Sequence, residues 1–569
     1  MSRQRRRVGL GIDVGTTNVK VAVVDVPEDG ADAPVLLAVA SAPTPGPAAL
    51  DRTLRELAVR ALAAAARRTG SAVVPEAVGL ASMAETGVPL DADDRPLGPW
   101  LRWDGHRAAA EAAALADRLG ATTLFEATGV RPSAKVPLAT LAWLGAHEPA
   151  TRAALHRWAG VADLAALRLT GELVTDHTLA GRTMAYRLPA TGVPLPDGFD
   201  ADLLAEVGLR PEHLPRVAPP DAASGTVSAP AWAAAGVRRG TPVTVAGHDH
   251  AVGAWAAGVR APGDVADSIG TAEAVCTVLA ADPVRADVAR AGMSLVRTVA
   301  GLPALLAGSS SAGAMVRWWL EHEAPGWSAD ALFAAVAALP ADERPHDVVV
   351  LPYVSGRQTP EPDPGARPAV LHRGSHGPVA LASAMVDGLA LHARWMLEVQ
   401  AGLAGPDHRP RQVRVLGGPA GRNTAWMRAK ALAGPVPVRL VDGAEPVAAG
   451  AALLALHRAG LLGAGEAPTL PLLPGLPDGS PVPDPDPRAG AALDRFVRAA
   501  LGADAPGSDR PGSDAPGTAA PASDPLGADA PGTDPPGTGT PAPPAPGAPT
   551  PEPAPRGAPP APHRQEARP

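Results

Sequence analysis

The sequence predicts an α/β protein with two related domains that face each other across a cleft, followed by a disordered C-terminal tail. Three observations predict this. Apolar runs with the alternation of strands are interleaved with longer runs typical of helices, which indicates α/β architecture. A strand followed by a Gly-Thr turn occurs once in each half of the chain. Near residue 501 the composition changes to a repeat rich in Pro, Gly and Ala.

The composition excludes several classes of protein. With 569 residues, 46% of them hydrophobic, the chain can bury two sizeable cores. Its one cysteine, Cys276, allows no intrachain disulfide and fits the reducing cytosol. A net charge of -8 gives no basic surface for nucleic acid, and no apolar run approaches the length of about 18 residues needed for a membrane span. We therefore expect a cytoplasmic protein without a nucleic-acid or membrane partner.

The chain begins with a basic leader and then a strand. No apolar export segment follows residues 1–6, so we interpret them as a solvated leader. From Val8 to Asp13 the residues alternate, with Gly9, Gly11 and Asp13 on one side of the strand. Because glycine has no Cβ, this side allows close approach of a ligand or of another backbone.

A Gly-Thr turn, residues 15–18, joins this strand to a returning strand over 19–24. Backbone N–H groups and hydroxyls at such a turn suit phosphate oxygens, and the nearby Asp13 suits the magnesium that accompanies them. The alternative is a tight hairpin with a solvated aspartate, because Asp and Gly are ordinary turn residues.

Two familiar nucleotide motifs are excluded. In the opening stretch the third glycine of a dinucleotide fingerprint falls one residue late, and a strand follows it. A Walker loop requires Gly-Lys-Ser/Thr, but none of the three lysines, Lys20, Lys135 and Lys430, follows a glycine. Any phosphate site is therefore of another kind.

A second acid occurs where another strand meets a helix. The apolar run 243–247 ends at a glycine, and His248, Asp249 and His250 follow before a helix of small residues. If Asp249 faces Asp13 across the cleft, it is placed to take a proton from a hydroxyl that attacks a γ-phosphate. One alternative is a helix N-cap. Another is a metal site, which we disfavour because two histidines at strand spacing point to opposite faces and no third ligand is evident.

The second half repeats the opening theme. The segment 261–275 predicts a short strand and a turn at Gly270 and Thr271, residues 377–400 predict a long helix, and residues 411–418 predict a strand that ends in two glycines. Residues 501–569 form an imperfect repeat of Ala, Pro, Gly, Ser/Thr and Asp. Such a segment buries too little apolar area to offset its chain entropy, which predicts disorder.

Over about residues 7–460 the sequence resembles the FGGY carbohydrate kinases of the actin, hexokinase and Hsp70 superfamily. Six segments carry the resemblance in the right order: GIDVGTTNVKVAVVD, AGHDHAVGA, DSIGTAEAV, LLAGSSSAGAMVRWWL, LPYVSGRQTPEPDPGARPAVL and VLGGPAGRNTAWMRAKALAGPVPV. The resemblance implies two ribonuclease-H-like domains, 7–257 for sugar and phosphate and 258–500 for adenosine, which close on substrate. It also implies ATP and Mg²⁺ as cofactors.

The resemblance assigns roles to individual residues. Asp13 would orient the Mg²⁺ ion through its water ligands, and Asp249 would be the general base. Phosphate contacts would come from Gly15, Thr16, Thr17 and Lys20 in the first domain and from Gly270 and Thr271 in the second. The adenosine pocket would be lined by Gly417, Gly418 and Asn423, and the sugar would meet Met83, Glu85, Asp104 and Asp249.

Departures from the family pattern concern the substrate. Ala84 stands where glycerol kinases carry arginine and xylulokinases carry histidine, so neither substrate is supported. Glu85 matches the acid of glycerol kinases and could accept from sugar hydroxyls, with a helix cap as the alternative. Asp104 lies one position earlier than the usual acid, and Thr140 replaces a frequent lysine. We interpret Trp103 and Trp143 as packing residues.

These observations predict an ATP-dependent kinase that phosphorylates a hydroxyl of a ketose or a similar sugar or polyol, and not of glycerol. The alternative is a catalytically silent nucleotide-binding sensor or scaffold of the same fold, or an actin-like or chaperone-like ATPase. The presence of Asp249 favours the kinase. The partner would be a small sugar or polyol. The oligomeric state stays open, with a homodimer as the expectation.

Overall fold

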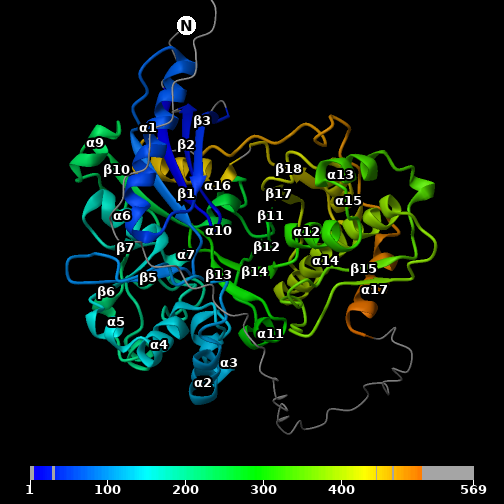
Figure 1. Ribbon diagram of the computed structural model, residues 1–569, viewed down its shortest axis with the longest axis horizontal. Coiled ribbons are helices and arrows are strands. Elements are labelled where there is room, and N and C mark those ends of the chain that lie inside the picture. Colours follow the sequence, from blue (N-terminus) through cyan, green and yellow to red (C-terminus); the bar gives the residue numbers. More distant parts are fainter. Residues whose placement is uncertain (1–5, 28–32, 444, 464–466, 503–569) are drawn as a thin grey trace, which may run out of the picture. The chain divides into compact units, whose positions relative to one another are not determined.

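The first half of the chain is organised around a mixed sheet (Figure 1). The computed structural model describes residues 6–27, 33–443, 445–463 and 467–502. Within these ranges the first sheet has the strand order β3-β2-β1-β4-β10-β9. Its strands are β1 (Arg6–Val14), β2 (Asn18–Pro27), β3 (Val35–Pro43), β4 (Ala77–Ser82), β9 (Gly225–Thr226) and β10 (Pro242–His248). The hairpin β1–β2 and its neighbour β3 are antiparallel, whereas β4 and β10 run parallel to β1.

A second sheet repeats this arrangement. Its order is β13-β14-β12-β11-β17-β18, with an antiparallel β11–β12 hairpin and with β17 and β18 parallel to β11. The strands are β11 (Val265–Ile269), β12 (Glu273–Val278), β13 (Ser294–Arg297), β14 (Pro303–Ser309), β17 (Val413–Leu416) and β18 (Val438–Leu440). The expectation of two related α/β domains is therefore confirmed, and both sheets belong to one unit of the chain, residues 1–508.

The two faces of β1 have different neighbours. Leu10 and Ile12 are fully buried in a core that includes α1 (Leu50–Thr69). The glycine face packs against α16 (Pro446–Arg458): a Cβ on Gly11 would lie 1.8 Å from the carbonyl oxygen of Ala448. Of the two partners that the sequence allowed for this face, a ligand or a backbone, the structure shows a helix backbone.

Helix α16 follows the second sheet in the chain but packs on the first (Figure 1). It contacts β1, β2, β4 and β10, and also α10 (Asp249–Ala256). Gly79 in β4 also lets α16 approach closely, because a Cβ at this position would lie 1.9 Å from the carbonyl oxygen of Ala451. The core around α10 and α16 includes residues of β2 and β4 as well as of β11 and β12. The segments 7–257 and 258–500 are thus joined by a shared core.

Other helices and short strands surround the first sheet. A separate core unites most of the helices between residues 108 and 217. The elements are α2 (Ala109–Leu119), α3 (Ala121–Thr128), α4 (Pro137–His147), α5 (Pro149–Ala154), α6 (Val161–Thr170), α7 (His177–Ala180), α8 (Ala201–Ala205), α9 (Pro230–Ala234), β5 (Gly87–Leu90), β6 (Arg157–Gly160), β7 (Val174–Thr175) and β8 (Arg216–Val217).

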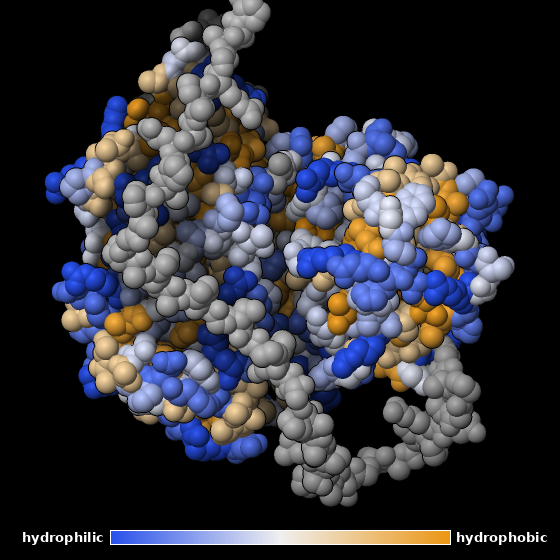
Figure 2. All heavy atoms as spheres, in the orientation of Figure 1, coloured by the Kyte–Doolittle hydropathy of each residue, from blue (hydrophilic) through white to orange (hydrophobic). Residues whose placement is uncertain are grey.

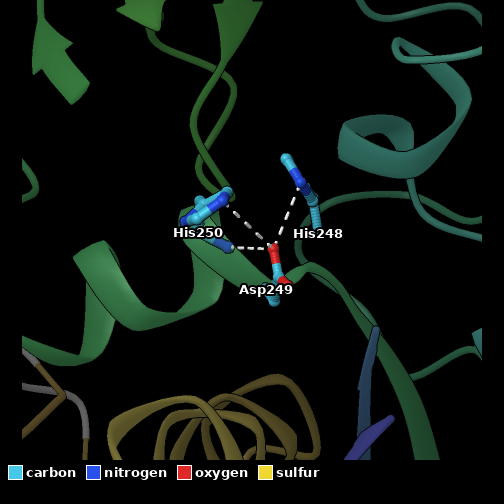
Figure 3. Close-up of side chains that lie close together, drawn as sticks. All are labelled: His248, Asp249 and His250. Carbon is cyan, nitrogen blue, oxygen red and sulfur yellow. Dashed lines mark hydrogen bonds and ion pairs between the residues drawn. The ribbon is translucent and has the colours of Figure 1, made fainter. Parts of the chain in front are cut away.

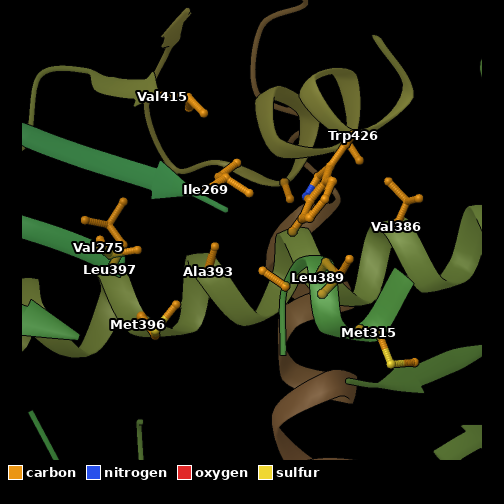
Figure 4. Packing of buried hydrophobic residues seen from close by; sticks show 14 of the residues in the cluster. Ile269, Val275, Met315, Val386, Leu389, Ala393, Met396, Leu397, Val415 and Trp426 are labelled. Atoms are coloured by element: carbon orange, nitrogen blue, oxygen red, sulfur yellow. The ribbon is translucent and has the colours of Figure 1, made fainter. Parts of the chain in front are cut away.

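The second sheet is covered by helices that pack around the long α14 (Pro378–Ala404). Figure 4 shows Leu389, Met396 and other α14 side chains in one core with Trp426 of α15 (Thr424–Ala433) and Ile269 of β11. The remaining elements are α11 (Arg285–Arg290), α12 (Gly313–His322), α13 (Ala329–Ala338), α17 (Ala489–Ala500), β15 (Val349–Leu351) and β16 (Ala369–Leu371).

The ends of the chain are described only in part. Of the expected leader 1–6, only Arg6 lies within the described residues, where it begins β1. Of the expected tail 501–569, only Leu501 and Gly502 do. Among the helices of the described ranges, none is both long and apolar enough to cross a membrane. On the face seen in Figure 2, hydrophilic and hydrophobic residues are interspersed, as is common for protein surfaces in water.

Candidate functional site

A cleft of about 460 Å³ is lined by residues of both halves of the chain. The first half supplies the β1–β2 turn, the segment after β4, three loops and the start of α10. The second half supplies the start of β12, the end of β14 and the loop after residue 355. The predicted residues in the lining are Thr16, Met83, Glu85 and Asp249. The structure thus brings together one phosphate residue, two sugar residues and the predicted base.

Asp13 ends the glycine face of β1 and is 8% exposed. Its pKa is raised to about 7, chiefly by burial and also by the charge of Asp249, while Lys20 opposes the shift. Among the described residues, no group hydrogen-bonds to its buried Oδ1. A bare carboxylate oxygen in the interior is costly, and oxygen is the ligand that magnesium prefers. The position therefore fits a bound cation or the water around one.

Asp249 is the first residue of α10 and lines the cleft. Its Oδ1 accepts the backbone N–H of His250 at 2.7 Å and lies 3.2 Å from Nε2 of His248 (Figure 3). Burial lowers the pKa of His248 to about 3, so its imidazole is neutral. Because these contacts involve Oδ1, Oδ2 is the oxygen that is available to accept a proton. The N-cap of α10 is His248, so the alternative of Asp249 as the cap residue is wrong.

The strand spacing of His248 and His250 predicted that the two side chains point to opposite faces, and this prediction is wrong. Strand β10 ends at His248 and α10 begins at the next residue, so the alternation stops between them. The rings of His248 and His250 meet edge to face with centroids 5.2 Å apart. A ring nitrogen of each histidine and a carboxylate oxygen of Asp249 lie within 4.8 Å of one another. Three potential metal ligands are therefore present, and the expectation that no third ligand is evident is also wrong.

A buried network holds the strand end that carries Asp249. The backbone N–H of His248 donates to Oγ1 of Thr178 at 2.8 Å, and that hydroxyl donates to Oδ1 of Asp176 at 2.7 Å. Arg458 of α16 donates to Oδ2 of Asp176 at 3.2 Å and to two backbone carbonyls, one on β10 and one after β13. A Cβ on Gly247, whose φ is 126°, would lie 2.3 Å from Oγ1 of Thr178. Sequence patterns could not reveal this network, because Arg458 and Asp176 are 282 positions apart.

The predicted phosphate turn is partly occupied by protein groups. The N–H of Gly15 donates to the carbonyl of Asn18 at 3.0 Å, and Thr17 is exposed. Oγ1 of Thr16 accepts from Nε1 of Trp103 at 3.0 Å. Lys20 pairs with Glu445 at 2.5 Å. Three of the predicted phosphate residues, Gly15, Thr16 and Lys20, therefore already have protein partners.

Trp103 is more than a packing residue, because it lines the cleft and bonds to the turn. Trp143, in contrast, stacks on His147 within α4, as a packing residue would.

Gly270 and Thr271 form the turn between β11 and β12. The carbonyls of these two residues accept the N–H groups of Gly313 and Ala314 at the start of α12. Neither turn residue lines the cleft, although the next two residues do. One of these, Glu273, forms a buried ion pair with Lys430.

The predicted adenosine residues lie together in the loop between β17 and α15. Gly417 has φ 105°, and its Cβ would lie 2.1 Å from the carbonyl oxygen of Ile269. Asn423 caps α15 by accepting the N–H of Trp426 at 3.0 Å. Gly417, Gly418 and Asn423 do not line the 460 Å³ cleft.

On the sugar side, Glu85 lies between β4 and β5, so the helix-cap alternative is wrong. Its Oε1 accepts from Nε and Nη2 of Arg182 at 3.0 and 2.8 Å. Asp104 instead pairs with Arg102 at 2.7 Å and does not line the cleft.

Sequence reasoning missed four cations of the cleft, Arg131, Lys135, Arg182 and Arg357. The rarity of lysine in the chain was the only signal that pointed to Lys135.

Comparison with known proteins gives matches over both halves. The model of the N-terminal domain of the FGGY family of carbohydrate kinases matches residues 8–256, and the model of its C-terminal domain matches residues 265–459. A xylulose kinase of Streptomyces coelicolor is 31% identical over 477 residues, which cover 81% of this chain and 89% of the relative.

Two solved structures share the fold. A xylulose kinase from Rhodospirillum rubrum has a TM-score of 0.69 at 26% identity and covers 87% of this chain and 98% of its own. A gluconate kinase from Lactobacillus acidophilus has a TM-score of 0.73 at 18% identity, with 88% and 99% covered.

Proposed function

Because the chain belongs to the FGGY family of carbohydrate kinases, and is thus an ATP-using phosphotransferase with an alcohol acceptor, we propose that Asp249 is the general base of this transfer. One observation carries the proposal. Asp249 lines the cleft, and its charge raises the pKa of Asp13, so the two carboxylates lie close to each other. A general base next to a cation site suits phosphoryl transfer.

In the proposed mechanism, Oδ2 of Asp249 takes the proton of the acceptor hydroxyl while the oxygen of this hydroxyl attacks the γ-phosphorus of ATP. The bond to the β-phosphate oxygen breaks, and ADP leaves. Contacts to Oδ1 from His250 and His248 fix the direction of the carboxylate. The imidazole of His248 is neutral, so it adds no positive charge next to Asp249.

Asp13 is the residue that we propose to hold Mg²⁺, through water. The support is its bare, buried Oδ1 and its raised pKa. When bound, the ion would neutralise the phosphate oxygens. Lys20 and Glu445 lie close enough to affect the pKa of Asp13.

The remaining nucleotide contacts are proposals from family resemblance and position. Gly15, Thr16, Thr17, Gly270 and Thr271 would meet phosphate at the two hairpin turns, and Gly417, Gly418 and Asn423 would meet adenosine. Lys20 would have to leave Glu445 to reach phosphate. We leave Asp104 out of the sugar site, because it pairs with Arg102 outside the cleft lining.

The acceptor in this proposal is a sugar or polyol of four to six carbons, and not glycerol. Ala84 lines the cleft with a small side chain, which leaves room for a longer chain than a large cation would. Similar proteins are named for xylulose and for gluconate.

We also propose a cytoplasmic location. The support is the single cysteine, Cys276, which is buried, and burial raises the pKa of its thiol to about 12. A protonated thiol of this kind is inert and needs no oxidising compartment. A homodimer remains an expectation.

Asp249→Asn tests the base. The amide keeps the shape and the contacts of Oδ1 but cannot take a proton, so turnover should fall roughly 10²–10⁴-fold while ATP affinity and Tm change little. The readout is coupled ADP release, measured with ketoses, aldoses and polyols as acceptors. The control variant is His250→Gln, which changes the residue next to Asp249. Near-normal turnover of the asparagine variant would remove Asp249 from this role. ATP binding without ADP release for any compound by the wild type would favour the silent sensor.

A further inference from the structure

One wall of the cleft carries more positive charge than its protein partners balance. Arg131, Lys135 and Arg182 line this wall, whereas Glu85 is the carboxylate among them. Lys135 feels the charges of Glu85 and Arg182, so the three side chains lie near one another. Arg182 also affects the pKa of His248 and therefore lies near the neighbour of the proposed base.

Glu85 accepts hydrogen bonds from only some of the N–H donors of Arg182. Its Nε and Nη2 both donate to Oε1 of Glu85, and its side chain is 15% exposed. Its Nη1 is buried and has no hydrogen-bond partner among the described residues. A buried guanidinium N–H without an acceptor is costly, so the geometry calls for an oxygen from a ligand.

Lys135 and Arg131 have no carboxylate of their own. The ammonium of Lys135 is partly buried and lies 5.1 Å from the ring centroid of Trp103. Burial lowers its pKa, and the charge of Glu85 opposes this shift. Neither Lys135 nor the more exposed Arg131 makes a hydrogen bond or ion pair within the described ranges.

Apart from the proposed base Asp249, the other charged groups of the lining already have protein partners. Glu273 pairs with Lys430, and the guanidinium of Arg357 donates to the carbonyls of Glu361 and Ala500. The unmatched cations are therefore confined to the wall next to Glu85. A neutral sugar would leave the charge of this wall uncompensated, whereas an anionic group would satisfy both a guanidinium and an ammonium.

From this wall we infer that the acceptor of the kinase is anionic: a polyhydroxylated chain whose charged oxygen group is bound by Arg182 and Lys135. Arg131 attracts the same group at the more exposed part of the wall. The inference rests on the proposed function, because it concerns the acceptor of that same transfer. The charged group is the carboxylate of a sugar acid or the phosphate of a sugar ester, since both present oxygens that Arg and Lys bind.

Matched acceptors test the class of compound. D-Gluconate and D-glucitol differ only in a carboxylate against a hydroxymethyl group, and D-xylonate and xylitol form a second pair. We expect kcat/KM for one acid to exceed that for its neutral partner at least roughly 10-fold. D-Arabinose 5-phosphate and D-glucose 6-phosphate test the ester source. A 10-fold preference for neutral sugars over both kinds of anion would overturn the inference.

Lys135→Met tests the residue assignment, because it removes the charge and keeps an unbranched side chain. KM for the preferred anion should rise at least roughly 10-fold, while KM for ATP stays unchanged. The matched control is Arg107→Met, since Arg107 lies over Trp143 outside the cleft lining and should leave both constants unchanged. A rise in KM for ATP with every acceptor would show that the cations serve the nucleotide instead, and an unchanged KM for the anion would equally contradict the assignment.

Calorimetry on the Asp249→Asn variant separates the two proposals. If sugar acids or esters bind and Lys135→Met weakens them, but the wild type transfers no phosphate to them, the anion site stands and the proposed transfer to it fails. If neutral sugars are phosphorylated and anions neither bind nor react, the kinase proposal stands and the anion site falls.

Discussion

At the scale of single residues, the buried Asp13 makes folding dependent on pH. Its pKa rises from 3.8 to about 7 in the folded chain, chiefly through burial. Between these values the folded chain holds a proton that the unfolded chain has lost, so this group's contribution to stability falls as the pH rises from about 4 to 7. Above pH 7 the buried carboxylate is ionised, and its full cost remains unless a cation binds.

Asp13→Asn should therefore raise the Tm of the metal-free protein at pH 8 by about 2–5 °C, and the gain should shrink toward pH 5. Thermal unfolding of both proteins across this range is the measurement. Mg²⁺ at pH 8 should stabilise the wild type and not the variant. A lower Tm for Asp13→Asn at pH 8, or an equal response of both proteins to Mg²⁺, would contradict the role of Asp13.

Thr178 is the residue whose loss should disturb catalysis without touching substrate. Its hydroxyl joins the N–H of His248 to Asp176, so Thr178→Val leaves the buried N–H of His248 without an acceptor next to the base, while Oδ1 of Asp176 keeps the backbone N–H of Thr178. We expect a loss of about 1–3 kcal/mol in stability and a fall in kcat of about 10-fold with KM for ATP unchanged. Thr178→Ser keeps the hydroxyl and should restore both. A valine variant with reduced stability but a normal kcat would leave Thr178 with a purely structural role.

At the scale of elements, the packing of α16 on β1 depends on glycine. A Cβ on Gly11 would meet the backbone oxygen of Ala448 at 1.8 Å, and a helix backbone cannot rotate away as a side chain can. Gly11→Ala should cost about 3 kcal/mol, measured by denaturant unfolding. Gly46→Ala is the control, since its Cβ would have no neighbour within 4 Å and should change stability by less than about 0.5 kcal/mol. Equal stability of the two variants would show that α16 can shift without cost.

Sequence periodicity predicted the elements that depend on local pattern. The β1–β2 hairpin and α14 lie where alternation and helical spacing placed them, because these patterns arise from neighbouring residues. The same alternation misled us at His248 and His250, where the strand becomes a helix within one residue. The alternation also revealed the glycine face of β1. It could not identify the element that packs on this face, since α16 lies more than 400 positions away in the chain.

The site was predictable where a motif is local and not where partners are distant. Asp13 and Asp249 could be proposed from the sequence because each lies where an apolar strand ends close to a glycine. Arg182 and Glu85 are 97 positions apart, and no pattern in either segment indicates their ion pair. The hydrogen bond from Trp103 to Thr16 spans 87 positions and was missed for the same reason.

At the scale of the whole molecule, the end of the folded body can be located by truncation. In α17, Phe496 is fully buried against Tyr353 and Trp395, and the carbonyl of Ala500 accepts from Arg357, which lines the cleft. Residues 503–569 lie outside the described ranges, and their composition lacks apolar anchors.

A chain of residues 1–502 should therefore keep the Tm and kinetics of the full protein. A chain of residues 1–488 should lose about 3–5 kcal/mol, the usual cost of a large buried aromatic, and activity with it. Thermal unfolding and ADP release on both truncations are the measurements. A loss of several degrees on removing 503–569 alone would mean that this segment docks on the body.

The position of α16 has a consequence for how the protein is made. A ribosome releases the strands of the first sheet early, but the helix that covers the glycine face of β1 is synthesised only after every strand of the second sheet. Domains usually fold as units in the order of synthesis. Here the first domain emerges with an uncovered apolar face and reaches its final packing only when the second is nearly complete. We therefore expect the nascent first half to depend on chaperones until residue 458 has left the exit tunnel.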